Sequence, residues 1–152
     1  MKIDITKIYE VVNVDLSVEN KKLGELLNKD KNIIYFYPKD NTPGCSLEAL
    51  DFTCMKGKFD ELGINIIGVS KDSIDSHKKF ISNLSLGIQF ISDKDLILHK
   101  ELGVYSEKNN YGKISMGVIR STFLISKTGE ILKEWRNVKA KGHVEKILKE
   151  II

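Results

Sequence analysis

Two segments of the chain, 32–37 and 64–69, consist mainly of isoleucine, valine and aromatic residues. A strand with one face in water alternates apolar and polar side chains, whereas a strand covered on both faces is apolar at nearly every position. Pro38 directly follows the first segment and stops it. The pattern therefore predicts two central, parallel strands.

The stretch between these strands carries apolar residues at helical spacing, and Gly63 supplies a helix stop. The apolar positions are Leu47, Leu50, Cys54, Met55, Phe59 and Leu62. The spacing predicts a crossover helix that joins the two strands, with these residues on its apolar face.

The next part of the chain continues the alternation of helices and strands. A second helix is predicted from about 73 to 86. A short strand at 89–91 follows, and then a third helix that Asp93 caps and that ends at Gly103. The histidines of the chain form no metal-ligand spacing, so each is interpreted as a structural residue.

Segments 121–126 and 131–135 are strand-like and flank a turn signal at 127–130, which predicts an antiparallel hairpin. A last helix is predicted from the apolar stripe Val144, Ile147, Leu148 and Ile151. This order of elements predicts an α/β fold, a thioredoxin-like sandwich with a central mixed sheet flanked by helices. We expect a single domain over 1–152.

Composition and charge narrow the class of protein. A chain of 152 residues with 41% hydrophobic residues can bury one core. No apolar run approaches the roughly 18 to 20 residues that cross a bilayer, and the start of the chain lacks a signal-peptide core, so we expect a cytoplasmic protein without a membrane partner. The net charge of +3 is spread along the chain, which argues against nucleic acid as a partner.

Cys45 and Cys54 are the only cysteines, too few for a disulfide framework and without the spacing of a zinc site. Cys45 falls in the first turn of the predicted crossover helix. The unpaired backbone N–H groups and the positive end of the helix dipole favour an anion there. Cys45 is therefore a candidate nucleophilic thiolate, and peroxides react with thiolates.

A peroxide site also needs groups that hold the O–O bond in line with sulfur and stabilise the leaving oxygen. The Thr42 hydroxyl lies three residues before Cys45, while Pro38 stiffens the loop. Arg120 is the candidate cation, because it opens a strand that we expect beside the strand leading to Pro38.

The motif Pro38-x-x-x-Thr42-x-x-Cys45 resembles the peroxidatic signature of the peroxiredoxins, in particular of the bacterioferritin comigratory protein, or peroxiredoxin Q, subfamily. Three further blocks resemble that subfamily and occur in the expected order, at 68–73, 116–125 and 135–143.

The resemblance implies a thiol-dependent peroxidase, an antioxidant enzyme that reduces hydrogen peroxide and organic hydroperoxides. Cys45 would be the peroxidatic cysteine, assisted by Thr42, Pro38 and Arg120, and Glu48 would orient Arg120 or the hydroxyl. It further implies a monomer or weak homodimer and a thiol donor such as thioredoxin. No haem, flavin, nicotinamide or metal motif is visible, so no cofactor is expected.

Many relatives carry a resolving cysteine five residues after the peroxidatic one, where this chain has Leu50. Cys54 is the remaining candidate, but nine helical residues span roughly 13 Å, and a disulfide needs Cα atoms within about 7 Å. Resolution by Cys54 would require the first helical turns to unfold. The favoured interpretation is a buried core thiol at Cys54, with an external thiol that reduces Cys45.

Two other classes of function share parts of this pattern. A redox sensor or scaffold on the same fold would use the same residues with little turnover. A disulfide reductase is disfavoured because Thr42 stands where a thioredoxin-like Cys-x-x-Cys motif has its first cysteine.

Overall fold

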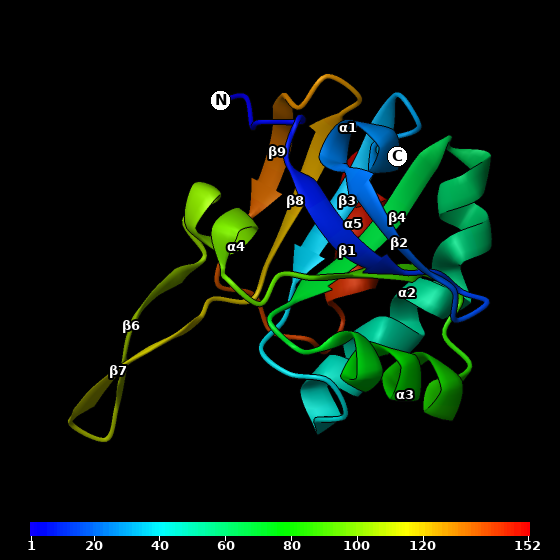
Figure 1. Cartoon of the computed structure of the whole chain (residues 1–152). Helices are drawn as coiled ribbons and strands as arrows, with labels where there is room; N and C mark the ends of the chain where they lie inside the picture. The colour runs from blue at the N-terminus through cyan, green and yellow to red at the C-terminus, as the bar shows by residue number, and fades with distance from the viewer.

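The computed structural model describes the backbone of residues 1–152 and every side chain except that of Asn110. A seven-stranded mixed sheet with the strand order β2-β1-β5-β4-β3-β8-β9 lies at its centre, with helices against both faces (Figure 1). Its strands are β1 (Ile8–Val12), β2 (Val18–Lys22), β3 (Lys31–Phe36), β4 (Ile64–Ser70), β5 (Gln89–Ser92), β8 (Ser121–Ser126) and β9 (Ile131–Trp135). The predicted fold class is confirmed.

The predicted helices all occur. They are α2 (Pro43–Glu61), α3 (Ile74–Leu84), α4 (Ile97–Glu101) and α5 (His143–Ile151), to which the structure adds the short α1 (Leu23–Leu26). The N-cap of α4 is Leu96 and not Asp93 as predicted, but Asp93 accepts hydrogen bonds from the backbone N–H groups of Ile97 and His99, at 3.0 Å each, and so stabilises the start of the helix.

Strand β3 separates two hydrophobic cores, because successive side chains of a strand point to opposite faces. Ile33 and Tyr35 belong to the core under α2, α3 and α5. Ile34 and Phe36 belong to the core under α1 and α4. β3 pairs in parallel with β4 and antiparallel with β8, so it lies inside the sheet as predicted.

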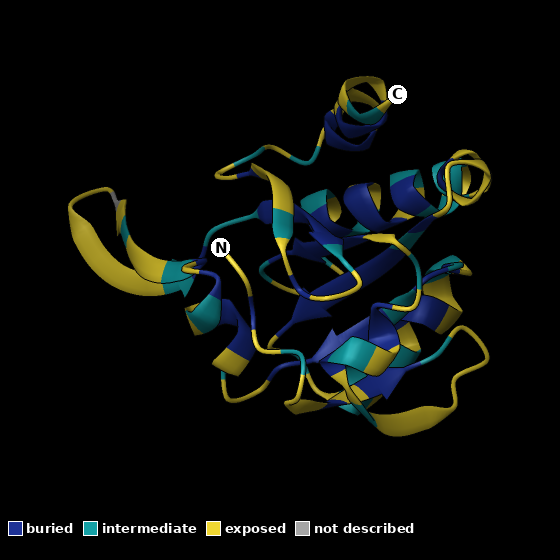
Figure 2. Cartoon of the chain, turned by 90° about the horizontal axis from the view of Figure 1, so that it is seen from above, coloured by how far each residue is buried: buried dark blue, intermediate teal, exposed yellow. Residues whose placement is uncertain are grey.

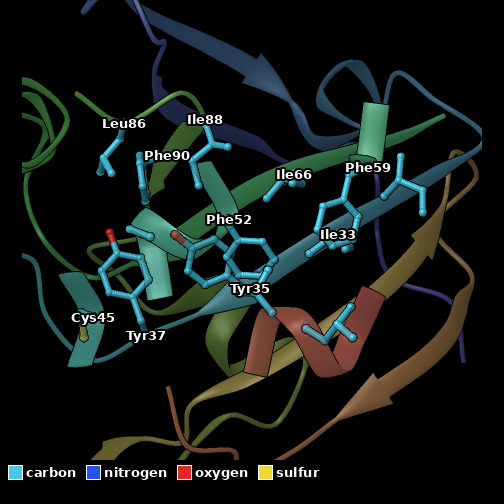
Figure 3. Packing of buried hydrophobic residues seen from close by; sticks show 14 of the residues in the cluster. Ile33, Tyr35, Tyr37, Cys45, Phe52, Phe59, Ile66, Leu86, Ile88 and Phe90 are labelled. Carbon is cyan, nitrogen blue, oxygen red and sulfur yellow. The ribbon is translucent and has the colours of Figure 1, made fainter. Parts of the chain in front are cut away.

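The buried face of α2 differs from the predicted one. Ala49, Phe52 and Phe59 are fully buried, and Phe52 stacks on Tyr35 with ring centroids 4.4 Å apart (Figure 3). Of the predicted apolar stripe, Phe59 is buried as expected and Met55 packs partly buried against the core, whereas four members are exposed: Leu47, Leu50, Cys54 and Leu62. Apolar residues occur on both sides of this helix, so their spacing alone does not identify the buried face.

A two-stranded ribbon, β6 (Tyr105–Asn110) and β7 (Lys113–Val118), extends away from the sheet (Figures 1 and 2). It was not predicted, and neither was the antiparallel pair of β1 and β2. Within the described residues, no helix is long and apolar enough to cross a membrane.

The burial of α2 can be tested by truncating one residue on each side of the helix. Phe52→Ala should lower the free energy of unfolding by about 3 to 5 kcal/mol, because it leaves a cavity beside Tyr35. Leu47→Ala should cost about 1 kcal/mol or less, because Leu47 is 39% exposed. Urea titration of both variants measures the difference. Equal losses would contradict the assigned buried face.

Candidate active site

Cys45 lies at the start of α2, directly after the loop that follows β3. Thr42 is the N-cap of the helix and Pro43 its first residue. The first intrahelical bond runs from the Ser46 N–H to the Thr42 carbonyl at 2.8 Å. The N–H groups of Gly44 and Cys45 precede that bond, so they have no partner within the helix and remain free for an anion.

Cys45 is 2% exposed and lies at the edge of the core, near Tyr37 (Figure 3). Arg120 reaches it from the neighbouring strand: β8 runs antiparallel to β3 with Ser121 opposite Phe36, which places Arg120 beside the loop. The Arg120 Nη2 donates to Cys45 Sγ at 3.2 Å. The strand arrangement expected for Arg120 is therefore present.

Glu48 fixes the other end of the same guanidinium. It lies one helical turn after Cys45, and its Oε1 accepts a hydrogen bond from Arg120 Nη1 at 2.5 Å. The Glu48 side chain is fully buried and that of Arg120 is 15% exposed. The guanidinium thus joins Glu48 and Cys45, two residues on one face of α2.

Gly44 provides the space for this guanidinium. A Cβ atom at position 44 would lie 3.3 Å from Arg120 Nη2 and 3.7 Å from the Cβ of Ala140. A contact of 3.3 Å is tighter than ordinary van der Waals contact, so any larger residue at position 44 would press on Arg120. Sequence reasoning did not single out Gly44, although its place directly before Cys45 could have indicated a close approach.

Burial raises the pKa of Glu48 to about 7, although the positive charge and hydrogen bond of Arg120 act in the opposite direction. For Arg120, burial lowers the pKa, but the negative charges of Glu48 and Cys45 outweigh it and the net shift is upward. The guanidinium thus stays charged, while Glu48 can gain or lose a proton near neutral pH.

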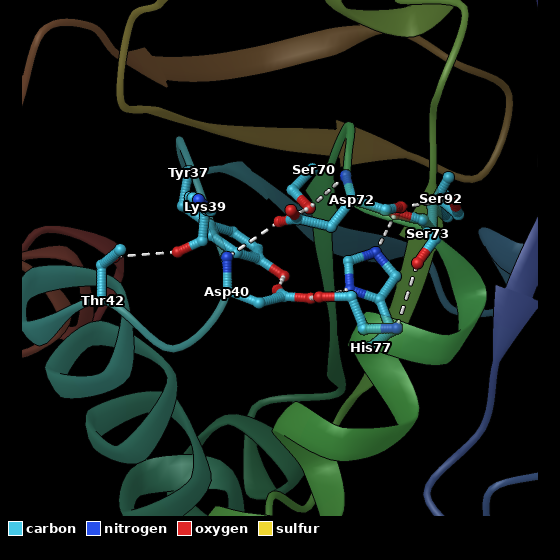
Figure 4. A network of polar contacts seen from close by, with 11 residues as sticks. Tyr37, Lys39, Asp40, Thr42, Ser70, Asp72, Ser73, His77 and Ser92 are labelled. Carbon is cyan, nitrogen blue, oxygen red and sulfur yellow. Dashed lines mark hydrogen bonds and ion pairs between the residues drawn. The ribbon is translucent and has the colours of Figure 1, made fainter.

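A buried polar network holds the loop that precedes Cys45 (Figure 4). Asp40 is its centre: its Oδ1 accepts the Tyr37 hydroxyl at 2.5 Å, and its Oδ2 lies 2.8 Å from Ser76 Oγ and 2.7 Å from His77 Nδ1. The Asp40 N–H donates to Asp72 at 2.8 Å. The loop is therefore attached to α3 and to the end of β4.

His77 must carry a proton on Nε2, because that atom lies 3.0 Å from the carbonyl oxygen of Ile91, which only accepts. His77 is thus a structural histidine, as expected. Asp40 and His77 are 37 positions apart, and sequence reasoning missed their pairing because no local pattern connects them.

The remaining predicted residues lie near Cys45 without a direct bond to it. The Thr42 hydroxyl donates to the Lys39 carbonyl at 2.8 Å (Figure 4). Pro38 is half-buried in the loop between β3 and α2. Within the described side chains, no group of His, Cys, Asp or Glu is suited to hold a metal ion.

The favoured interpretation of Cys54 was wrong. Its side chain is exposed, so Cys54 is not a core thiol. The physical reason is the phase of α2: Cys54 lies on the solvent side, whereas Phe52 and Phe59 fill the core. Both cysteines are free, and the helix between them is continuous.

The chain is similar in sequence to known proteins of one family. Residues 6–134 match the model of the AhpC/TSA family. The chain is 46% identical over 116 residues to Peroxiredoxin Bcp of Xanthomonas campestris pv. campestris, covering 76% of this chain and 72% of that protein. It is also 46% identical over 119 residues to Peroxiredoxin Bcp of Bacillus subtilis, covering 78% and 76%.

A similar solved structure is that of a cysteine-to-serine mutant of PrxQ from Xylella fastidiosa. The TM-score is 0.88 at 34% sequence identity, and the match covers 99% of this chain and 92% of that one. The likeness therefore includes nearly all of the first thirty residues.

The raised pKa of Glu48 predicts a pH-dependent contribution to stability. Folding shifts this pKa from 4.5 to about 7, so the protonated form is favoured in the folded state. The stabilisation is fully present below pH 4.5 and is lost as the pH rises through about 7.

Between about pH 5 and 8, the free energy of unfolding of the wild type should fall by about 2 to 3 kcal/mol relative to that of Glu48→Gln. Urea titrations of the reduced proteins at several pH values measure this difference. Parallel pH profiles for the two proteins would show that Glu48 does not titrate in this range.

Proposed function

The chain belongs to the AhpC/TSA family and is a peroxiredoxin, and on this premise we propose that its peroxidase cycle runs through Cys45. The observation that carries the proposal is the hydrogen bond of 3.2 Å from Arg120 Nη2 to Cys45 Sγ. A fixed cation beside a thiol at a helix N-terminus stabilises the thiolate, which is the reactive form.

In the first step, the thiolate of Cys45 attacks the terminal oxygen of a hydroperoxide. The S–O bond forms as the O–O bond breaks, and Cys45 becomes a sulfenic acid. The leaving hydroxide or alkoxide takes a proton from water and departs as water or an alcohol. Hydrogen peroxide and organic hydroperoxides both fit this reaction.

Arg120 and the free N–H groups of the helix start stabilise the charge on the oxygens during this step. Donors that are already oriented cost no reorganisation when the charge develops. Glu48 serves as the positioning residue, since it holds Arg120 Nη1 at 2.5 Å while Nη2 faces the sulfur. Thr42 and Pro38 shape the loop, and a rotation of the Thr42 hydroxyl away from the Lys39 carbonyl would offer a donor to the peroxide.

In the second step, the sulfur of a thiol attacks the sulfenic acid and forms a disulfide with Cys45, and the displaced hydroxide leaves as water with the proton of the thiol. A second thiol then restores Cys45. We propose an external thiol donor, thioredoxin or a smaller thiol, because Cys54 lies nine residues along an unbroken helix and faces solvent. Such donors belong to the cytosol, which is the proposed location.

The role of Arg120 can be tested with stopped-flow kinetics, using the fluorescence of Trp135. Arg120→Lys should slow the oxidation of Cys45 by hydrogen peroxide about a hundredfold, because an ammonium cannot contact Glu48 and the sulfur together. Lys127→Gln, at the opposite end of β8, is the matched control and should react normally. Cys45→Ser should not react.

A wild-type rate in Arg120→Lys would remove Arg120 from the mechanism. A wild-type protein that reacts no faster than a free thiol would make the redox sensor or scaffold the leading interpretation.

The role of Cys54 can be tested by intact mass after one equivalent of peroxide. The wild type should show a sulfenic acid on Cys45 and no internal disulfide, since the two sulfurs cannot meet across an intact α2. Cys54→Ser should therefore keep full turnover with an external thiol. A Cys45–Cys54 disulfide in the wild type, together with lost turnover in the variant, would make Cys54 the resolving residue.

A further inference from the structure

A basic pocket with a volume of about 340 Å³ lies between the end of β9 and the first turn of α5. Its lining includes four cationic side chains, one histidine and one apolar residue: Arg136, Lys139, Lys141, Lys146, His143 and Val138. The volume is that of a site for a small molecule. No step of the proposed cycle uses this pocket.

The positive charge of the basic pocket is largely uncompensated. Among the ion pairs of the described side chains, none within 4 Å involves Lys139, Lys141 or Lys146. Arg136 has one exposed ion pair, of 3.4 Å with Glu134; it also donates to the Gly103 carbonyl at 3.4 Å and lies over the Phe123 ring at 5.0 Å. A concave site lined by charges of one sign concentrates ligands of the opposite sign. The complementary ligand is therefore an anion.

His143 forms part of the wall of the pocket and can report on a ligand bound there. Its side chain is 4% exposed and lines the pocket, and its Nε2 lies 2.8 Å from Thr122 Oγ1. Its Nδ1 has no hydrogen-bond partner among the described atoms. Burial, followed by the charges of Lys146 and Arg120, lowers the pKa of His143 to about 4, so the ring is neutral at pH 7.

The start of α5 borders the same pocket, because its N-cap Gly142 and its first residue His143 are among the lining residues. His143 is the first residue of this helix, and the first backbone bond that closes on the N-cap runs from Lys146 to Gly142 at 3.1 Å. The N–H groups of Val144 and Glu145 precede that bond and have no partner within the helix. Such N–H groups, together with the positive end of the helix dipole, favour carboxylates and phosphates.

The basic pocket adjoins the surroundings of Cys45. The Val138 N–H donates to the backbone carbonyl of Arg120 at 3.0 Å. Ala140, in the same loop, lies next to Gly44, whose Cβ position would be 3.7 Å from that of Ala140. The loop that lines the pocket is therefore bonded to the backbone of Arg120 and passes next to Gly44, the residue before Cys45.

We propose that the basic pocket binds the carboxylate of a small anionic co-substrate and so directs its reactive end to Cys45. The inference rests on the proposed function, in which Cys45 meets a hydroperoxide first and a thiol second. Either molecule can carry the carboxylate, and both would use the same cations and N–H groups.

Binding can be tested without turnover, by NMR on the reduced full-length protein with succinate as the probe. Succinate should shift the resonances of the His143 ring and of the α5 N-terminus and raise the pKa of His143, because a bound anion stabilises the imidazolium. The uncharged succinamide should not. Shifts spread over the lysines of the whole surface, or none at His143, would overturn the proposal.

Kinetics identify which co-substrate is bound. One arm compares the oxidation of Cys45 by 6-hydroperoxyhexanoate and by its methyl ester. The other compares the reduction of oxidised Cys45 by 3-mercaptopropionate and by its methyl ester. The measured quantity is the ratio of the rate with the carboxylate to the rate with its methyl ester. In the arm that uses the pocket, this ratio should fall by on the order of tenfold in the triple variant Lys139→Gln, Lys141→Gln, Lys146→Gln.

The matched control is Lys58→Gln, Lys94→Gln, Lys100→Gln, which removes the same charge from exposed sites outside the pocket. It should keep the wild-type preference. Equal preferences in the wild type and the pocket variant, in both arms, would overturn the inference while leaving the peroxidase intact. If the proposed peroxidase function is wrong, wild-type Cys45 will not react with hydrogen peroxide. The succinate titration would then still test whether the basic pocket binds an anion.

Discussion

The buried ion pair between Glu48 and Arg120 joins helix α2 to strand β8 and determines what surrounds Cys45. A buried carboxylate and guanidinium lose much of their hydration, and such a pair is retained only where geometry and hydrogen bonds compensate. Here the compensation is shared: one nitrogen of Arg120 contacts Glu48 and another contacts the sulfur. A change in the charge of Glu48, Arg120 or Cys45 therefore changes the electrostatic environment of the other two.

The rest of the fold supplies the rigidity that this group requires. Strand β3 lies between β4 and β8, so the point where it ends is fixed from both sides. The loop that follows is held by Asp40, whose two carboxylate oxygens have partners in Tyr37, directly after β3, and on α3. Cys45 thus lies on a helix start whose position is fixed by a sheet, a neighbouring helix and an ion pair, and its reactivity depends on all three.

Much of the fold could be predicted because its central elements carry strong local signals. Three local patterns each allow one interpretation: the continuous apolar run of β3, the turn before β9 and the apolar stripe of α5. The pattern of α2 does not identify the buried face of that helix, because leucines lie on its solvent side while Glu48, a charged residue, is buried. For the site, the position of Cys45 followed from local pattern, and that of Arg120 from strand order. The contact between Asp40 and His77 and the close approach of Arg120 to Gly44 join residues far apart in the sequence, so no local sequence pattern predicts them.

The division of the interior by the sheet has a consequence for how this protein can vary. Cys45, Phe52 and Trp135 belong to the core on one face, whereas the side chains of α1 and α4 pack on the other. Substitutions that share no contacts usually have independent energetic effects. The core beneath α1 and α4 still touches the site where Phe36 ends β3 and where Val118 and Ile119 precede Arg120, so substitutions elsewhere in that core should act on overall stability and those at these positions on the placement of Arg120 as well.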